Sequence, residues 1–362
     1  MPIKNAKQFI DRLSPLARAL LIFSASMATL ISVALILFPS SPAMRPSESV
    51  DKFLQMNECV AHMASNGEAL AIAVSYLPPF GKGPGLPKQE GGVILVQHGK
   101  PPIRTPLQVG AMRSIVATPS GFLAARVTYD KDANDTAYFF EVDLEGRVTE
   151  LPPLEIDLVG LWVTANGEIH AYSPQAVFRR VKTNPTWERV PLDPAVNSEA
   201  IRRIVTLKDG ASLIVTDRLI KGFRNLQMPP VFVNNMNTYP KPIDAYGDDN
   251  NWWIVTRDGQ NHKISLVLKN GDTKEVASTP VWLIKRLLFG SDKVFVVCAP
   301  AIHQDTYYVL NRDGSGKLRG PFSLPDGTIV TCLWGETVMN GGYESRERTP
   351  LILRLMQKFN LL

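Results

Sequence analysis

The sequence predicts an all-β fold that is built from a repeated unit and preceded by a single apolar helix. The first observation is a pattern that recurs through most of the 362 residues: an apolar segment, a tight polar turn and a second apolar segment. The second is the nearly constant spacing of these turns. The third is that only one uncharged stretch, residues 19–38, is long enough to cross a lipid bilayer.

Composition excludes several classes of protein. The chain is 45% hydrophobic and 20% charged, which is too apolar for an intrinsically disordered protein. Its three cysteines are too few to staple a chain of this length. The formal net charge is +5, but residues 1–43 carry four bases and one acid, so the rest is nearly neutral. Without a concentrated basic face we expect no nucleic-acid partner.

The first part of the chain is expected to anchor the protein in a membrane. Residues 1–18 are basic, and the positive-inside rule places them in the cytoplasm. Residues 19–38 would span the bilayer as a helix that ends before Pro39 and Pro42. Everything beyond would then be extracytoplasmic, which means periplasmic in a bacterium. A cleaved signal peptide is the alternative, although the apolar run exceeds the usual length of roughly 7–15 residues.

One face of the expected helix carries small residues at every fourth position. These are Ser24, Ala28 and Ser32. Small side chains let two helices in a membrane approach closely. The stripe therefore predicts a weak homodimer, and the common occurrence of small residues in single spans is the alternative explanation.

The repeat is marked by one turn residue in each unit, usually a glycine. The markers are Gly67, Gly121, Gly167, Gly210, Asn251, Asp292 and Gly335, with spacings of 54, 46, 43, 41, 41 and 43 residues. Several units contain a second hairpin with an Asn-Gly or Asp-Gly turn. A β-sandwich does not sustain one period over so long a chain, and a β-solenoid has a shorter repeat.

Four short strands in each unit of about 46 residues resemble the blades of a β-propeller. The resemblance covers residues 44–362 and is to the architecture, with no specific family identified. It implies seven blades, with six or eight as alternatives. The last unit shows three strands, at 328–333, 336–339 and 351–356, so we expect residues 49–55 to complete it, because an unpaired edge strand invites aggregation.

These expectations divide the chain into four parts. Residues 1–18 form a cytoplasmic basic arm, and residues 19–38 form the transmembrane anchor helix. Residues 39–55 provide a linker and the closing strand. Residues 56–362 form the propeller.

The longest loops are expected to emerge together on one face of the propeller, which we call the long-loop face. Long loops on a rigid scaffold usually carry function. Exposed aromatic side chains are typical anchors of protein interfaces. The sequence therefore predicts a protein-binding face, with packing of the rings beneath their own loops as the alternative. Its candidate residues are Phe80, Tyr129, Tyr239, His303 and Tyr343.

No motif predicts a metal, a cofactor or a catalytic centre. The five histidines are far apart, and no pair has the spacing of zinc ligands. Residues 130–135 weakly resemble a calcium loop, but Asp135 stands where such a loop needs glycine, so a solvated hairpin loop is expected. Cys59, Cys298 and Cys332 lie in apolar runs and are expected to be buried core residues. A bridge between the last two is the less favoured alternative.

Together these features predict a membrane-anchored, non-catalytic, protein-binding propeller on the extracytoplasmic side. An envelope scaffold and an immunity-type inhibitor of a toxin are two roles of this kind. The alternative is an extracytoplasmic enzyme, a hydrolase or a lyase, with its site in the central channel. Several His, Asp or Glu side chains converging at the axis would favour the enzyme, and an apolar axis would favour the binding protein.

Overall fold

In the computed structural model, residues 47–342 form a closed ring of β-sheets within the unit Ser47–Leu362. The structure describes residues 47–55, 58–76, 91–107, 111–129, 135–164, 166–181, 183–184, 186–192, 196, 199–207, 209–223, 232–233, 241–248, 250–268, 270–280, 283–299, 306–324 and 328–342. The expected basic arm and anchor helix, residues 1–38, lie outside this set. None of the described helical segments is long and apolar enough to span a bilayer.

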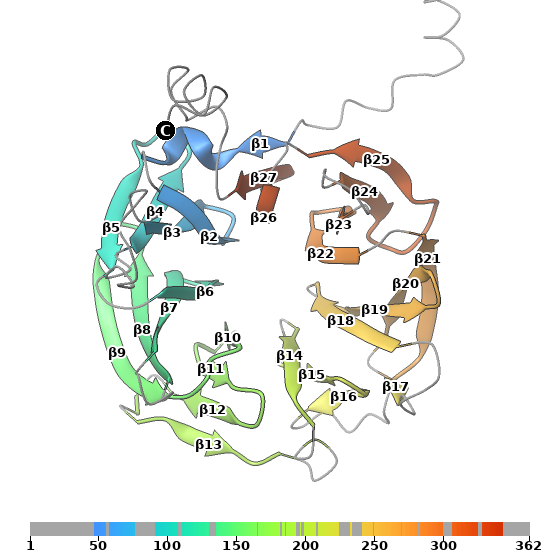
Figure 1. The fold of residues 1–362 in the computed structure, drawn as a ribbon, viewed down its shortest axis with the longest axis horizontal. Coiled ribbons are helices and arrows are strands. Elements are labelled where there is room, and N and C mark those ends of the chain that lie inside the picture. The colour runs from blue at the N-terminus through green and yellow to red at the C-terminus, as the bar shows by residue number, and fades with distance from the viewer. Residues whose placement is uncertain are drawn as a thin grey trace, which may run out of the picture. The chain divides into compact units, whose positions relative to one another are not determined.

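Seven sheets follow one another around a central axis, and each sheet is one blade (Figure 1). The chain visits the blades in order, so neighbours in sequence are neighbours in space. Six blades have four strands in meander order. The first three contain β2 (Glu58–Ser65), β3 (Ala69–Tyr76), β4 (Gly91–Gln97) and β5 (Ile103–Leu107); β6 (Ala111–Thr118), β7 (Gly121–Tyr129), β8 (Asp135–Asp143) and β9 (Val148–Glu155); and β10 (Gly160–Val163), β11 (Ile169–Tyr172), β12 (Val177–Arg180) and β13 (Glu188–Val190).

The remaining blades continue the same pattern. Blades 4 to 6 contain β14 (Ile201–Thr206), β15 (Ser212–Thr216), β16 (Leu219–Phe223) and β17 (Phe232–Val233); β18 (Lys241–Gly247), β19 (Trp252–Asp258), β20 (Asn261–Val267) and β21 (Thr273–Thr279); and β22 (Leu283–Phe289), β23 (Lys293–Ala299), β24 (Thr306–Asn311) and β25 (Arg319–Ser323). Blade 7 contains β26 (Thr328–Trp334), β27 (Thr337–Gly342) and β1 (Glu48–Ser49). The expected seven-bladed, all-β propeller is confirmed.

The five glycines among the turn residues that mark the repeat all have a positive φ. Gly67 and Gly210 stand at matching places in blades 1 and 4, with φ of 90° and 89°. Side chains rarely adopt such positive φ values, whereas glycine adopts them freely. The spacing of these glycines therefore gives the spacing of the hairpins along the chain.

The hydrophobic core lies between the blades, because strand side chains alternate between the two faces of a sheet. The adjacent residues Trp252 and Trp253 at the start of β19 show this alternation. Both are fully buried. Trp252 packs with Val205 and its neighbours in blade 4, whereas Trp253 packs with residues of blade 6 such as Val294. One apolar pair thus joins three consecutive blades.

Blade 7 closes the ring by pairing the two ends of the described chain. β1 runs parallel to β27, with Glu48 opposite Met339 and Ser49 opposite Asn340. The closure lies in the blade where it was expected, but the strand is shorter than 49–55, because the 3₁₀ helix Val50–Phe53 follows at once. The expected strand at 351–356 lies outside the described residues.

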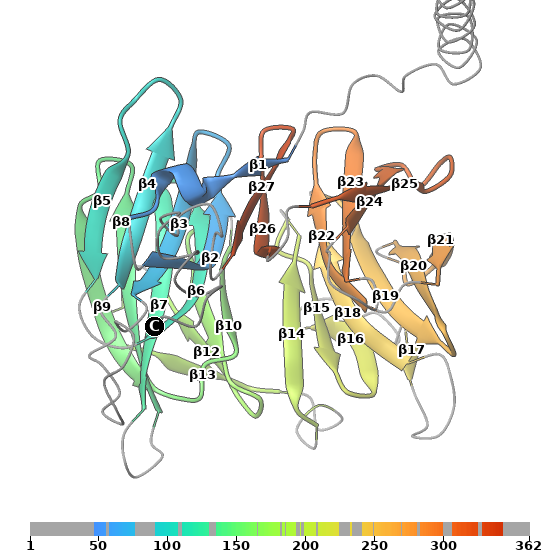
Figure 2. The same cartoon turned by 45° about the horizontal axis from the view of Figure 1, so that its top comes forward.

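Val50 anchors this closure from the first turn of the 3₁₀ helix. Its side chain is fully buried and packs with Val60 of blade 1 and Met339 of blade 7. The backbone of Gly341 lies so close that a Cβ there would be 2.9 Å from Val50 Cγ2 and 2.7 Å from Val60 Cγ2. Figure 2 shows β26 and β27 between the first and sixth blades. Cys59, Cys298 and Cys332 are buried and none of them forms a disulfide, so the alternative bridge is not present.

Candidate functional site

The first strand of each blade lines the axis, and these inner strands share an irregularity. Six of the seven shift register by one residue where they pair with the second strand of their blade. The shifts occur between Val60 and His62, Met112 and Ser114, Ile201 and Arg203, Pro242 and Asp244, Ile284 and Arg286, and Thr328 and Val330. Such β-bulges insert one extra residue and turn the local side chains. Each bulge lies near the beginning of its strand, which is the end where the chain enters from the preceding blade.

The inner strands enclose a channel with a cavity of about 790 Å³. Its lining changes character along the strands. Positively charged side chains line the level of the bulges: Arg113, Arg203, Lys285 and Arg286. Apolar residues such as Val116, Leu161 and Leu333 line the level beyond it, towards the tight turns. The channel is therefore cationic at one end and largely apolar further in.

Two of the channel arginines are held by main-chain oxygens that lie outside their own blades, one in the connection between β9 and β10 and one in β26. Arg113 Nε donates to the Leu158 carbonyl at 2.8 Å, and Arg286 Nη1 donates to the Thr331 carbonyl at 3.0 Å. Both side chains nevertheless belong to exposed residues. These bonds fix the arginines in place. A carbonyl is neutral and does not form an ion pair with the guanidinium, although Arg286 still interacts electrostatically with Asp244.

The third arginine has a charged partner. Arg203 Nε lies 2.8 Å from Asp244 Oδ1 in the next blade, and its guanidinium lies 4.9 Å from the centre of the Tyr246 ring. The Tyr246 hydroxyl in turn donates to the Lys285 carbonyl of blade 6 at 3.1 Å. Burial raises the pKa of the Tyr246 hydroxyl, so this group stays protonated and acts as a donor.

His62 lines the same channel and lies within electrostatic reach of two of its arginines. Its pKa is lowered from 6.5 to about 4, mainly by burial and further by the positive charges of Arg286 and Arg113. The imidazole is therefore neutral at neutral pH. Burial disfavours a charge of either sign, but the part of the shift that comes from Arg286 and Arg113 has the sign of a positive potential at His62.

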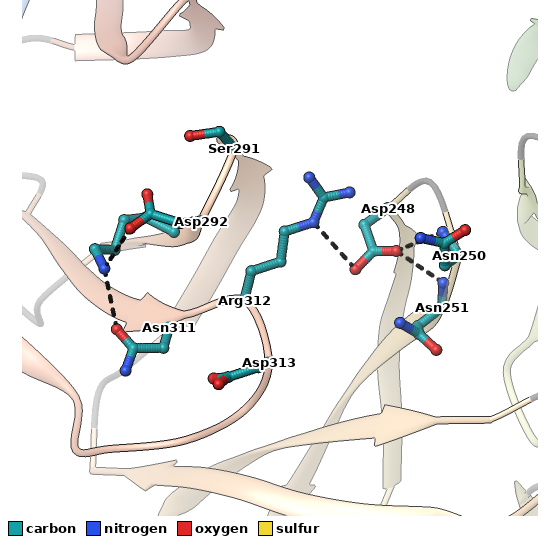
Figure 3. A pocket seen from close by; sticks show the side chains of 9 residues that line it. Asp248, Asn250, Asn251, Ser291, Asp292, Asn311, Arg312 and Asp313 are labelled. Carbon is teal, nitrogen blue, oxygen red and sulfur yellow. Dashed lines mark hydrogen bonds and ion pairs between the residues drawn. The ribbon is translucent and has the colours of Figure 1, made fainter.

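A second cleft, of about 440 Å³, lies at the tight-turn ends of blades 5 and 6 (Figure 3). Asp248 occupies it with a side chain that is only 2% exposed. Its Oδ1 accepts from the Asn250 and Asn251 amides, each at 2.7 Å, and its Oδ2 accepts from Trp253 Nε1 at 2.9 Å. Arg312 Nε lies 3.5 Å from the same Oδ2. The carboxylate has its acceptor positions filled by protein, so this cleft is a structural clamp between blades.

The predicted protein-binding residues remain a prediction. Phe80, Tyr239, His303 and Tyr343 lie outside the described residues. Tyr129 is the last residue of β7, where its backbone pairs with Asp135, but its side chain lies outside the described set. The weak calcium-loop pattern at 130–135 falls almost wholly outside it as well. Within the described part of the chain, no three His, Cys, Asp or Glu side chains gather as a metal site would need.

The channel arginines were missed in the sequence, although a signal for them exists. In three units two polar residues, at least one of them basic, interrupt an otherwise apolar inner strand. These interruptions are Arg113-Ser114, Arg202-Arg203 and Lys285-Arg286, each flanked by Met, Ile or Leu. A regular strand would bury one residue of each pair, so such a doublet indicates a bulge.

Comparison with known proteins identifies the architecture and no narrower group. No family model matches the chain, and no curated protein sequence matches it. Among solved structures, the β-propeller domain of the trilobed protease from Pyrococcus furiosus is similar, with a TM-score of 0.51 and 8% identity over 77% of this chain and 88% of that one. Prolyl oligopeptidase B from Galerina marginata has a TM-score of 0.51 and 11% identity, covering 76% of this chain and 44% of that one.

A protein from Lactobacillus plantarum is also similar, with a TM-score of 0.48 and 12% identity over 78% of this chain and 87% of that one. At such identities the likeness concerns the fold. The chain is thus a seven-bladed β-propeller.

Proposed function

We propose that this chain is a membrane-anchored, non-catalytic propeller that binds a protein partner on the extracytoplasmic side. The observation that carries the proposal is the character of the channel. Its described lining combines fixed arginines with apolar side chains, which is a lining suited to holding a ligand. An envelope scaffold and an immunity-type inhibitor of a toxin are the two roles that fit such a protein.

The chemistry of the channel favours binding over hydrolysis or elimination. A guanidinium stays protonated at neutral pH and does not act as a general base. The carboxylate of Asp244 is engaged by Arg203 at 2.8 Å. His62, with a pKa of about 4, is a weak base at the pH where most enzymes work. The alternative hydrolase or lyase would need acid and base groups that are better matched to neutral pH.

Anchoring and location are proposed from the sequence. The basic residues 1–18 and the uncharged residues 19–38 support a single span with the N-terminus in the cytoplasm. The test fuses to the C-terminus a reporter that becomes active only outside the cytoplasm. Activity of the fusion supports this topology, and a silent but stably produced fusion contradicts it.

Capture of a partner from native membranes tests the binding role. The full-length tagged chain is crosslinked in cells, purified in detergent and analysed by mass spectrometry. The long-loop variant Phe80→Ala with Tyr343→Ala is compared with Val148→Ala with Leu268→Ala, which removes two exposed apolar side chains towards the tight-turn ends of the blades.

One stoichiometric partner that the long-loop variant loses and the control keeps would support both the function and the face. A partner retained by both variants would support binding and refute the choice of face. If no stoichiometric partner is recovered from any membrane preparation, the binding role is wrong.

A further inference from the structure

The channel holds more positive charge than its described residues neutralise. Arg113, Arg203 and Arg286 line it, and Asp244 is the acid paired among them. Arg113 and Arg286 are exposed residues, and their hydrogen bonds to other described residues go to neutral carbonyl oxygens. Two guanidinium groups therefore line the channel without an ion-pair partner among the described residues, and Asp244, which pairs with Arg203, is the acid that interacts with Arg286. The depressed pKa of His62 has the same origin in part, since both arginines contribute to it.

The side chains of Arg113 and Arg286 are preorganised for binding an anion. A long side chain normally loses rotamer freedom when it is fixed. Here the carbonyls of Leu158 and Thr331 already restrict Arg113 and Arg286. A planar guanidinium that uses one N–H on a carbonyl keeps other N–H groups for a carboxylate or a phosphate. Binding then costs less conformational entropy than it would on a flexible surface.

The apolar part of the lining narrows the class of ligand. Beyond the arginine level the cavity is lined by Val116, Leu161, Leu333 and similar residues. A free inorganic anion would gain nothing from this surface. A chain that carries a carboxylate next to apolar side chains would bury them there. The volume of about 790 Å³ is within the range of sites that enclose a small ligand or a short peptide segment.

We infer that the channel binds an extended acidic segment of a protein partner, with its carboxylates on Arg113 and Arg286 and its apolar side chains deeper along the axis. This inference rests on the proposed binding function and specifies the chemistry of the contact. It places the contact inside the channel, in addition to the predicted long-loop face. It also makes the interaction sensitive to salt, since the attraction acts between charges that solvent reaches.

Peptide binding to the full-length chain in detergent tests the inference. The probe is a fluorescein-labelled octapeptide of alternating Glu and Leu, followed by fluorescence anisotropy. The matched peptide replaces every Glu with Gln, which keeps size and apolar content and removes the charge. Inorganic phosphate and citrate serve as competing small anions. We expect the Glu peptide to bind, the Gln peptide to bind at least about tenfold more weakly, and added salt to weaken the Glu peptide.

Channel variants connect the binding to the named residues. Arg113→Gln with Arg286→Gln should weaken the Glu peptide about a hundredfold, because each charge-assisted bond is worth at least about a factor of ten. The matched control, Arg147→Gln with Arg179→Gln, removes the same charge from ion pairs outside the channel and should leave binding unchanged. Ser114→Glu places a carboxylate beside the arginines without removing an interblade bond, and it should also abolish binding. It keeps the test decisive if the double variant fails to fold.

The outcomes separate this inference from the proposed function. Equal binding of the Glu and Gln peptides, or undiminished binding by Ser114→Glu, would overturn the inference. So would tight binding of phosphate or citrate with none of the Glu peptide, because the channel would then be a small-anion site. If a cellular partner is captured equally by parent and channel variants, the binding function stands and the channel contact is wrong.

Discussion

Arginines join neighbouring blades both in the cleft and in the channel, and two of the channel arginines, Arg113 and Arg286, have the opposite electrostatic setting from Arg312. In the cleft between blades 5 and 6, Arg312 faces the buried carboxylate of Asp248 (Figure 3). In the channel, the hydrogen bonds that Arg113 and Arg286 make within the described part of the chain go to carbonyl oxygens. The first arrangement balances its charge internally and serves stability. The second fixes its side chains and keeps their charge, which is the arrangement that a ligand can use.

The largest effect is expected where the charge is balanced. Asp248→Ala removes the acceptor of two turn amides, of Trp253 Nε1 and of the Arg312 guanidinium. Breaking a buried pair from one side leaves polar groups without partners, so the free energy of unfolding should fall by about 3–5 kcal/mol. Urea unfolding followed by tryptophan fluorescence measures this change.

The neighbouring carboxylate Asp292 provides the matched control. It lines the same cleft, but its side chain is 69% exposed and pairs with Lys293 in solvent. Asp292→Ala should unfold at the same urea concentration as the parent, because exposed ion pairs contribute little. Equal destabilisation by the two substitutions would show that the cleft as a whole, and not the buried clamp, holds these blades.

The next effect depends on pH and lies in the channel. The folded chain holds His62 neutral down to a pKa of about 4, whereas the unfolded chain protonates it at its ordinary value of about 6.5. The unfolded state thus binds more protons as pH falls from about 6.5 to about 4, and stability is lost over that window. Allowing for partial solvent access, the loss should reach about 2–3 kcal/mol.

His62→Gln isolates this contribution from those of the other histidines. Unfolding by urea at about pH 7 and about pH 4.5 should show a smaller loss for the variant than for the parent. The same loss in both proteins would mean that His62 is not the group that charges on acidification.

A smaller change is expected when one channel arginine is neutralised. Arg286→Gln keeps a donor for the Thr331 carbonyl but removes the charge, so the free energy of unfolding should change by about 1 kcal/mol or less. The pKa of His62 should rise towards its ordinary value, because Arg286 is one of the charges that lower it. Histidine NMR titration measures that pKa. An unchanged pKa would show that the charge of Arg286 does not act on His62.

Much of the fold could be predicted because its hairpin turns and buried strands depend on residues that are close in sequence. The spacing of Gly67, Gly121 and their counterparts follows hairpin turns that need positive φ, and the apolar runs follow strands buried on both faces. The closing strand was placed in the correct blade but given the wrong length. Pairing of Glu48 and Ser49 with β27 depends on Val50 packing against two distant blades, and no local pattern encodes such a contact.

The site was harder to predict for a physical reason. The prediction was based on aromatic residues in loops. The charged side chains of the described channel lie instead on inner strands, whose apolar composition predicts that they are buried. Arg113 reaches the axis only because a bulge breaks the alternation of β6. The doublet with Ser114 was visible, but its meaning depends on pairing with a strand whose register the sequence does not state.

The recurrence of the bulge has a consequence for which residues line the channel. Six inner strands carry an extra residue near the same level, and the bulges of β6 and β22 bring exposed side chains such as Arg113 and Lys285 to the lumen. Exchanging a side chain there alters what the lumen attracts while the interlocked β-framework stays intact. A propeller of this kind can change its ligand preference through a few substitutions at one level of the channel, while the fold is kept.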